Sequence, residues 1–385
     1  MHQAPRLPLP AAHAAAITGL AVPAISRCVL MVVVVIACAS CSPLPRRLGP
    51  VPLAPGQNGA ILERAACTVI TNPRDFSDAV RKYYLDDILE AKLATELATE
   101  LAARPLASTF SYAENLRLAK AVKAGRCERV MYRSSGLRVA GFVLRPAGPG
   151  PHPVVIWLRG GSGEFGKIDG VMLLNLQWLA DAGFMVIATQ YRGADGGEGH
   201  DEFGGADVDD VMALLPLARS LPGADMGRLY LLGNSRGAMQ GTIAMRRGLP
   251  VRAAAFRGGV FDLTTLLARR PDFDRFWRQV IPHYDADGKA ALQRRSAVNW
   301  ARELRVPVLF LHGRKDMRSH VDDVVNFDAM LAMAGVERKM VIYERDQHQL
   351  ALHRPEWLRE ALGWFRRHGA FDAGATGQRQ DLLRG

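Results

Sequence analysis

Short apolar runs alternate with amphipathic stretches along the chain from about residue 150 onward. The runs carry few polar side chains, which is typical of strands buried on both faces of a parallel sheet. Their alternation with helical stretches predicts an α/β fold with a mostly parallel central sheet and helices on both faces. The predicted strands are PVVIWL, FMVIAT, RLYLLG, AAAF, VPVLFLH and KMVIYE, and the predicted helices cover about 170–182, 208–220, the residues after 235, 321–334 and 355–367.

The pattern differs at both sides of this region and at one place inside it. Residues 128–146 read as two short strands around a Ser-Ser-Gly turn, and residues 61–124 as a helical segment with Leu every four residues at 89–101. A helical insertion over about 263–304 interrupts the alternation. We therefore predict an α/β domain over 125–370 and a flexible tail over 371–385.

The N-terminus has the pattern of an export signal. Residues 1–27 carry basic but no acidic side chains, and CVLMVVVVIACA follows without a charge. This run is shorter than the about 20 residues of a membrane-spanning helix but fits the apolar core of a signal peptide over 1–39. VIAC resembles the lipobox of bacterial lipoproteins, which predicts a periplasmic protein tethered to the membrane through acylated Cys38 or, second, Cys41. Residues 40–60, rich in Pro and Gly, read as the tether.

Two cysteines follow the signal, Cys67 and Cys127. In an oxidising compartment they would form a disulfide between the N-terminal segment and the α/β domain. Two separate buried thiols are the alternative.

The formal net charge is +11, but the Arg residues are scattered and interleaved with acidic ones. This distribution indicates a basic solvated surface rather than a nucleic-acid site. The acidic stretch 193–210 lacks the spacing of a calcium loop, and helix caps and turns account for it. We expect neither a metal nor a cofactor.

The stretch YLLGNSRGAMQG places Ser235 between a predicted strand and a predicted helix. In this context Gly-x-Ser-x-Gly predicts a nucleophile elbow, because side chains at Gly233 and Gly237 would collide in so sharp a turn. The N–H of Arg236, at the start of the helix, would point at a developing oxyanion.

A base and an acid follow in the order that this fold requires. Asp316 lies in the loop after VPVLFLH and His348 in the loop after KMVIYE. Carboxyl ends of neighbouring parallel strands meet at one edge of a sheet, so both side chains can reach Ser235. Alternative candidates for the acid are Asp322 and Asp323, which fall where a helix begins. Alternative candidates for the base are His320 and His353. We assign His312 a structural role beside the strand end.

Four segments, QYRGADGGEGHDEFGGADVDDVMALLPLA, GNSRGA, HGRKDMRSHVDD and ERDQHQL, resemble in this order the catalytic domain of the prolyl oligopeptidase family of serine hydrolases. The resemblance covers about residues 128–368. It implies the triad Ser235, Asp316 and His348 and hydrolysis through an acyl-enzyme.

The chain departs from the family at the oxyanion stretch, where WLRGGSGEFG has Arg159 in place of the family's Tyr or His. Backbone N–H groups of Gly160 or Gly161 could supply the oxyanion donor on this side. Arg159 itself could assist the oxyanion, bind an acidic substrate group or point away from the site.

A second departure is that the segment before the α/β domain is too short for the family's β-propeller. The sequence thus predicts an exported serine hydrolase acting on a small peptide or ester, with a peptidase favoured over a carboxylesterase. A catalytically silent, membrane-tethered binding protein is the alternative from another class. Four aromatic residues of the insertion, Phe273, Phe276, Trp277 and Tyr284, either line an apolar pocket or pack among themselves.

Overall fold

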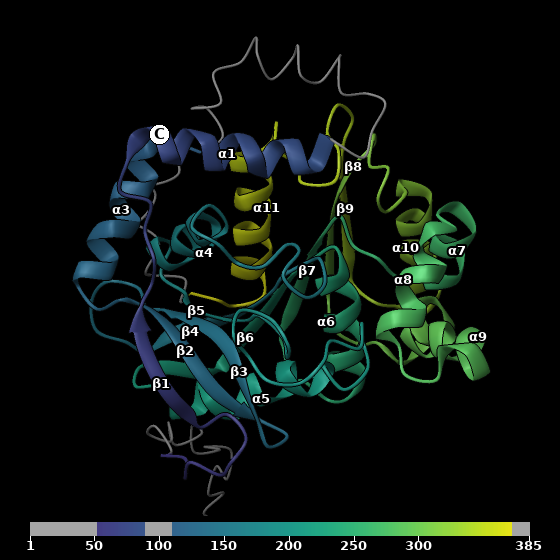
Figure 1. Ribbon diagram of the computed structural model, residues 1–385. Helices are drawn as coiled ribbons and strands as arrows, with labels where there is room; N and C mark the ends of the chain where they lie inside the picture. Colours follow the sequence, from purple (N-terminus) through teal and green to yellow (C-terminus); the bar gives the residue numbers. More distant parts are fainter. Residues whose placement is uncertain (1–51, 89–109, 372–385) are drawn as a thin grey trace, which may run out of the picture. The chain divides into compact units, whose positions relative to one another are not determined.

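A single sheet of nine strands organises the part of the chain that the computed structural model describes, residues 52–88 and 110–371 (Figure 1). Its order is β1-β2-β3-β5-β4-β6-β7-β8-β9. The first four strands in this order pair antiparallel, and all pairs from β5 to β9 are parallel. The strands are β1 (Ile61–Ala66), β2 (Cys127–Ser134), β3 (Leu137–Leu144), β4 (His152–Leu158), β5 (Met185–Thr189), β6 (Ala224–Asn234), β7 (Ala253–Arg257), β8 (Val308–Gly313) and β9 (Arg338–Tyr343).

The centre of the sheet is buried on both faces, as the unbroken apolar runs predict. Every residue of β4, β5, β7 and β8 is buried. Residues 154–158 of β4 pair with β5 on one side and with β6 on the other. The predicted α/β architecture with a mostly parallel sheet is therefore confirmed.

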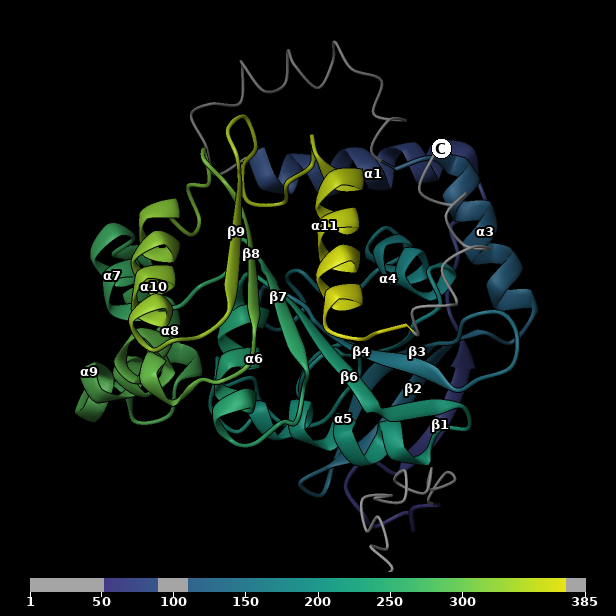
Figure 2. The ribbon, with the colours of Figure 1, turned by 180° about the vertical axis from the view of Figure 1, so that it is seen from behind.

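Helices cover both faces of the sheet (Figures 1 and 2). One apolar cluster joins one face to α4, α11, α3 and α1, and a second joins the other face to α5, α6 and α10. The helices are α1 (Pro73–Ile88), α3 (Tyr112–Lys123), α4 (Met172–Asp181), α5 (Val208–Ser220), α6 (Arg236–Arg246), α10 (Val321–Met333) and α11 (Arg354–Arg367).

The predicted insertion is a separate helical layer with its own small core. It contains α7 (Leu263–Arg269), α8 (Asp272–Val280), α9 (Tyr284–Arg295) and the 3₁₀ turn η2 (Ala297–Glu303). Apolar side chains of α7, α8 and α9 pack together and against Phe203 and Met239. In Figure 1 this layer lies beside α10, at the right of the sheet.

The segment before the α/β domain is not only helical. Residues 61–66 form β1, which adds to the sheet edge through antiparallel pairing with β2. Helical periodicity did not reveal this strand, because its side chains are mostly exposed and its pairing partner is distant in sequence. Farther along, Ser111 and Glu114 form a reciprocal capping box at the start of α3.

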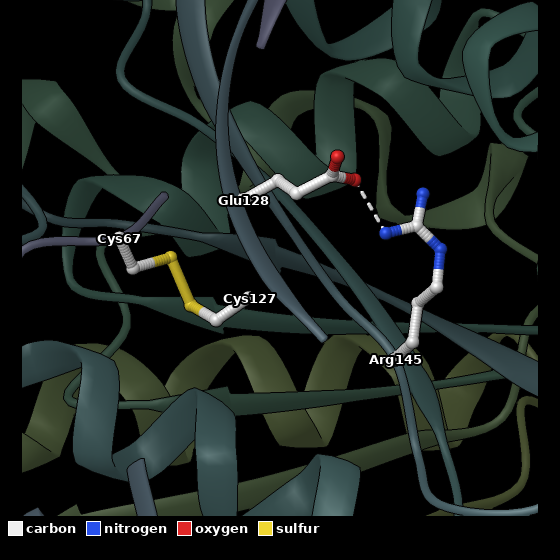
Figure 3. Close-up of a disulfide and its surroundings, with 4 residues drawn as sticks. All are labelled: Cys67, Cys127, Glu128 and Arg145. Atoms are coloured by element: carbon white, nitrogen blue, oxygen red, sulfur yellow. Dashed lines mark hydrogen bonds and ion pairs between the residues drawn. A yellow bond between two sulfur atoms is a disulfide. The ribbon is translucent and has the colours of Figure 1, made fainter. Parts of the chain in front are cut away.

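Cys67 and Cys127 form a disulfide, with 5.5 Å between their Cα atoms (Figure 3). It links the end of β1 to the first residue of β2, which decides between the two alternatives that the sequence left open. Beside it, Glu128 pairs with Arg145 and, at 2.7 Å, with Arg64. The N-terminal strand is thus fastened covalently and by ion pairs.

Several sequence predictions concern residues outside the described ranges. These are the signal peptide, the acylation sites Cys38 and Cys41, most of the tether, the Leu repeat at 89–101 and the tail after residue 371. Among the described helices, none is long and apolar enough to cross a membrane.

Candidate active site

Ser235 occupies the sharp turn between β6 and α6. Its backbone has φ 53° and ψ −120°, a conformation that a residue with a side chain rarely adopts. The Ser235 N–H donates to the carbonyl oxygen of Arg257, at the end of β7, at 2.9 Å. This strained strand-to-helix turn is the geometry of a nucleophile elbow.

The glycines around Ser235 are required for close packing, as the motif predicts. A Cβ at Gly233 would lie 2.6 Å from the carbonyl oxygen of Gly237, and a Cβ at Gly237 would press on the carbonyl group of Leu158. A Cβ at Gly160 would lie 2.9 Å from the Cβ of Ser235. Larger residues at these positions would displace the serine.

His348 and Asp316 meet at the carboxyl edge of the sheet. Asp316 follows β8 and His348 follows β9. The Nδ1 atom of His348 lies 2.8 Å from Oδ2 of the buried Asp316. The other oxygen, Oδ1, accepts the backbone N–H groups of Arg318 and Ser319 at 2.8 and 2.9 Å. These bonds fix the carboxylate before any substrate arrives.

The surroundings of Asp316 determine how the pair is protonated. Burial raises the pKa of its carboxyl, but the charge of His348 and hydrogen bonds from His312 and His348 outweigh burial and bring the pKa well below its usual value. Asp316 is therefore a carboxylate, which only accepts hydrogen bonds. The Nδ1 atom of His348 must therefore carry the hydrogen of their hydrogen bond, which directs Nε2 of the ring away from the carboxylate.

His312 supports the same carboxylate from the strand end. Its Nε2 lies 2.7 Å from the carbonyl oxygen of Ser319 and 3.2 Å from Oδ2 of Asp316. Ser319 adds a hydroxyl 2.9 Å from the same carboxylate oxygen. The sequence assigned His312 a structural role, but gave no sign of Ser319.

The alternative acids and bases are engaged elsewhere. Asp322 and Asp323 begin α10 and pair with Arg269. His320 occupies the N-cap position of α10, and His353 binds Asp346 at 2.6 Å just before α11. None of these side chains lines the cavity that contains Ser235, whereas His348 does.

The three residues predicted to supply oxyanion donors line the same cavity as Ser235. Arg236 is the first residue of α6, and the first N–H groups of a helix have no partner within it. Gly160 and Gly161 follow the end of β4 and line the same cavity, and Gly161 has φ 67°, which favours glycine. Gly160, Gly161 and Arg236 are thus placed at the cavity that contains Ser235, and their role as oxyanion donors stays a prediction.

The side chain of Arg159 does not face the cavity. It is fully buried and uses its five N–H bonds on backbone carbonyl oxygens of Gln190, Gly160, Phe165 and Gly163, at 2.7–3.0 Å. Burial, with the nearby Arg236, lowers its pKa to about 10. Of the three roles that the sequence leaves open for Arg159, these contacts support the third: rather than binding the oxyanion or the substrate, the guanidinium points away from the cavity and holds the 160–166 loop.

Arg236 has a structural role that the sequence did not reveal. Its buried guanidinium binds Asp201 at 2.5 and 2.6 Å and also pairs with Asp207. It lies between the rings of Tyr191 and Phe203, at 4.7 and 4.8 Å from their centroids. The available signal was an arginine directly after the serine, together with the acidic stretch 193–210 that the sequence analysis assigns to helix caps and turns. These contacts fix the position of Arg236, the first residue of α6.

Ser235 and His348 line a cavity of about 710 Å³. Its walls come from the 160–167 loop, the strand ends of β6 and β7, and two appended elements. The N-terminal helix α1 contributes Ala79, Lys82 and Tyr83, and the insertion contributes Leu266, Arg270, Asp272, Phe273 and Phe276.

The four aromatic residues of the insertion divide between the two predicted roles. Phe273 and Phe276 line the cavity. Trp277 and Tyr284 are buried in the core of the insertion and pack against each other at 6.4 Å between ring centroids. The insertion therefore supplies an apolar wall and also packs on itself. No group of three or more His, Cys, Asp or Glu side chains in residues 52–88 and 110–371 is arranged to hold a metal ion.

Comparison with known proteins agrees with this geometry. The sequence model of the Prolyl oligopeptidase family matches residues 170–370. The chain belongs to the prolyl oligopeptidase family. It is 32% identical over 192 residues to the uncharacterized peptidase YtmA of Bacillus subtilis, covering 50% of this chain and 74% of YtmA. It is 26% identical over 216 residues to the acylamino-acid-releasing enzyme of Arabidopsis thaliana, covering 51% of this chain and 28% of that one.

Solved structures show the same fold at lower identity. The acylaminoacyl peptidase of Pyrococcus horikoshii superposes with a TM-score of 0.55 at 20% identity, covering 66% of this chain and 43% of that one. Family membership makes the protein a serine hydrolase. The chain spans most of YtmA but less than half of the plant enzyme and of the archaeal structure.

Proposed function

We propose that the protein is a serine peptidase in which Ser235 is the nucleophile, His348 the general base and Asp316 the residue that orients it. One observation carries the proposal. The strained Ser235 and the Asp316-bound His348 line one cavity, with backbone donors beside the serine. A serine hydroxyl becomes a competent nucleophile only where a base and an oxyanion site are held around it.

The residues then act in a defined order. Nε2 of His348 removes the hydroxyl proton while Oγ of Ser235 attacks the substrate carbonyl carbon, and the N–H groups of Gly160 or Gly161 and of Arg236 bind the resulting oxyanion. The intermediate collapses when the bond to the leaving amine breaks, and His348 gives that amine its proton. Water, deprotonated by the same His348, attacks the acyl-enzyme, and the bond to Oγ of Ser235 breaks as His348 returns the proton to that oxygen, which releases the acid and free Ser235. Asp316 stabilises the imidazolium in both steps.

Short peptides are the proposed substrates. YtmA is named a peptidase and the plant relative an acylamino-acid-releasing enzyme. The apolar wall of Phe203, Val260, Phe273 and Phe276 suits an apolar side chain next to the scissile bond. Helix α1 borders the same cavity, which favours a short chain over an extended protein loop.

We further propose that the protein works in the periplasm, anchored through an acylated Cys38 or Cys41. The signal-like residues 1–39 motivate this localisation. The Cys67–Cys127 disulfide supports it, because disulfides persist in oxidising compartments. Globomycin treatment of cells that express the full chain tests the anchor: accumulation of the uncleaved precursor supports it, and normal processing contradicts it.

Matched substrates test peptidase against carboxylesterase activity. N-acetyl-Phe-Ala-Ala and the ethyl ester of N-acetyl-Phe share one acyl group and differ in the leaving group. We expect both to be cleaved after Phe by the wild type, and neither by Ser235→Ala. Cleavage of the ester alone would make the protein a carboxylesterase. Failure of both, and of a wider set of peptides and esters, would favour the binding-protein alternative.

A further inference from the structure

Arg257 links the nucleophile to the histidine loop. Its carbonyl oxygen accepts the N–H of Ser235 at 2.9 Å. Its guanidinium donates from Nη1 to the carbonyl oxygen of Gln349 and from Nη2 to the amide Oε1 of Gln349, at 2.9 and 3.0 Å. Gln349 directly follows His348. One residue therefore contacts both segments that must keep a fixed separation for proton transfer.

The guanidinium is also buried beside an aromatic ring. Arg257 is 3% exposed, and its Cζ lies 4.7 Å from the ring centroid of Trp357 in α11. Among the described residues, its polar partners are oxygens of the neutral Gln349 rather than a carboxylate. A planar fork on two oxygens of one residue fixes orientation as well as distance, which an ion pair through a single atom does not do.

The link continues to the N-terminal helix. The hydroxyl of Tyr83 in α1 donates to the same Oε1 of Gln349 at 3.0 Å. Tyr83 and Gln349 both line the cavity. The element that precedes the α/β domain thus contacts the loop that carries His348.

We propose that Arg257 is a positioning residue for His348, and that Gln349 and Tyr83 extend its bridge to helix α1. The bridge keeps the histidine loop at the distance from Ser235 that proton transfer needs. Its contribution to activity rests on the proposed function of Ser235 and His348, whereas its effect on the loop does not.

The test compares Arg257→Ala with Arg228→Ala, a matched control. Arg228 joins separate segments as well, since it donates to the carbonyl oxygens of Ala370 and Pro151 besides the carboxylate of Asp225, but it lies nearer the opposite end of β6. Hydrolysis of p-nitrophenyl butyrate gives kcat and KM, and guanidinium chloride at millimolar concentration is added to each variant. Hydrogen exchange of peptides covering residues 345–352 reports on the loop independently of catalysis.

We expect Arg257→Ala to lower kcat about 100-fold with KM changed less than about threefold, because misplacement of a reacting group by about 1 Å has an effect of this size. Added guanidinium should restore part of kcat in Arg257→Ala only. Exchange of the 345–352 loop should rise in Arg257→Ala and to a smaller degree in Tyr83→Phe. Arg228→Ala should lose stability but keep kcat, without a response to guanidinium.

Three results separate the possible failures. If a folded Arg257→Ala variant exchanges the amide hydrogens of residues 345–352 as slowly as the wild type does, the proposed bridge is wrong, whatever the activity of the variant. Increased exchange in a protein whose wild type shows no hydrolase activity would support the bridge and contradict the proposed function instead. An equal loss of kcat in Arg228→Ala would mean that Arg257 acts only through general stability, which also overturns the proposal.

Discussion

The carboxylate of Asp316 accepts the Nδ1–H of His348 at 2.8 Å from a buried position, with two backbone N–H groups on its other oxygen. Replacement of Asp316 by Asn would present an amide N–H or a neutral oxygen to the ring and destabilise the imidazolium. We expect Asp316→Asn to lower kcat about 10³- to 10⁴-fold with little change in KM. Asp323→Asn, in the neighbouring helix, should change kcat less than about threefold. Steady-state kinetics of the two variants decides, and an equal loss in both would contradict the assignment of the acid.

The position of Arg159 leads to a second prediction. Arg159→Met would leave carbonyl oxygens of Gly160, Gly163 and Phe165 without their donor and loosen the loop that carries the oxyanion N–H groups. We expect kcat to fall about 100-fold for neutral and acidic substrates alike, together with a lower Tm. A loss confined to the KM of acidic substrates would instead mean that the guanidinium binds substrate.

The ion pair of Asp201 and Arg236 predicts a pH dependence of stability. Burial raises the pKa of Asp201, but the charge and hydrogen bonds of Arg236 outweigh burial and lower the pKa to about 2. Because the folded-state pKa lies below the ordinary value of about 3.9, the stabilisation is fully present above about pH 4 and is lost as the pH falls toward 2.

Urea unfolding of the wild type and of Asp201→Asn checks this dependence. The wild type should be more stable by about 2 kcal/mol at pH 6, and the difference should shrink below pH 4. A difference between the two proteins that stays constant from pH 6 to pH 3 would contradict the ion-pair explanation.

The disulfide predicts how the N-terminal strand responds to reduction. Cys67 and Cys127 are 60 residues apart, so the bond closes a long loop in the unfolded chain. Loop-closure entropy for this length corresponds to about 4 kcal/mol of unfolding free energy. We expect Cys67→Ser/Cys127→Ser to lose a few kcal/mol by urea unfolding and the wild type to lose as much in dithiothreitol. An unchanged stability after confirmed reduction would contradict this contribution.

Much of the fold could be predicted from the sequence, because strands buried on both faces carry unbroken apolar runs. The runs near Ile156, Leu231 and Phe310 each fall within a central strand. The edge strand β1 could not be found in this way, since its exposed side chains have no such pattern and its pairing depends on a distant partner.

The candidate site, like the fold, could be predicted from the sequence only in part. Ser235, Asp316 and His348 were predicted as a set because a motif and the order of strand ends constrain them, and the structure places Ser235 and His348 at one cavity with Asp316 bound to His348. The orientation of Arg159 was not, because a guanidinium after a strand can turn toward either the cavity or the loop. The bridge from Arg257 through Gln349 to Tyr83 joins three distant segments by side chains, and no local pattern marks such contacts.

Covalent labelling tests most directly whether Ser235 is an activated nucleophile. Purified protein is treated with a fluorophosphonate and its intact mass is measured, with Ser235→Ala and Asp323→Asn as matched variants. The wild type and Asp323→Asn should each gain one adduct, located on Ser235 by peptide mapping, and Ser235→Ala should gain none. A folded wild type without an adduct, or an adduct that persists in Ser235→Ala, would contradict the proposed catalytic role of Ser235.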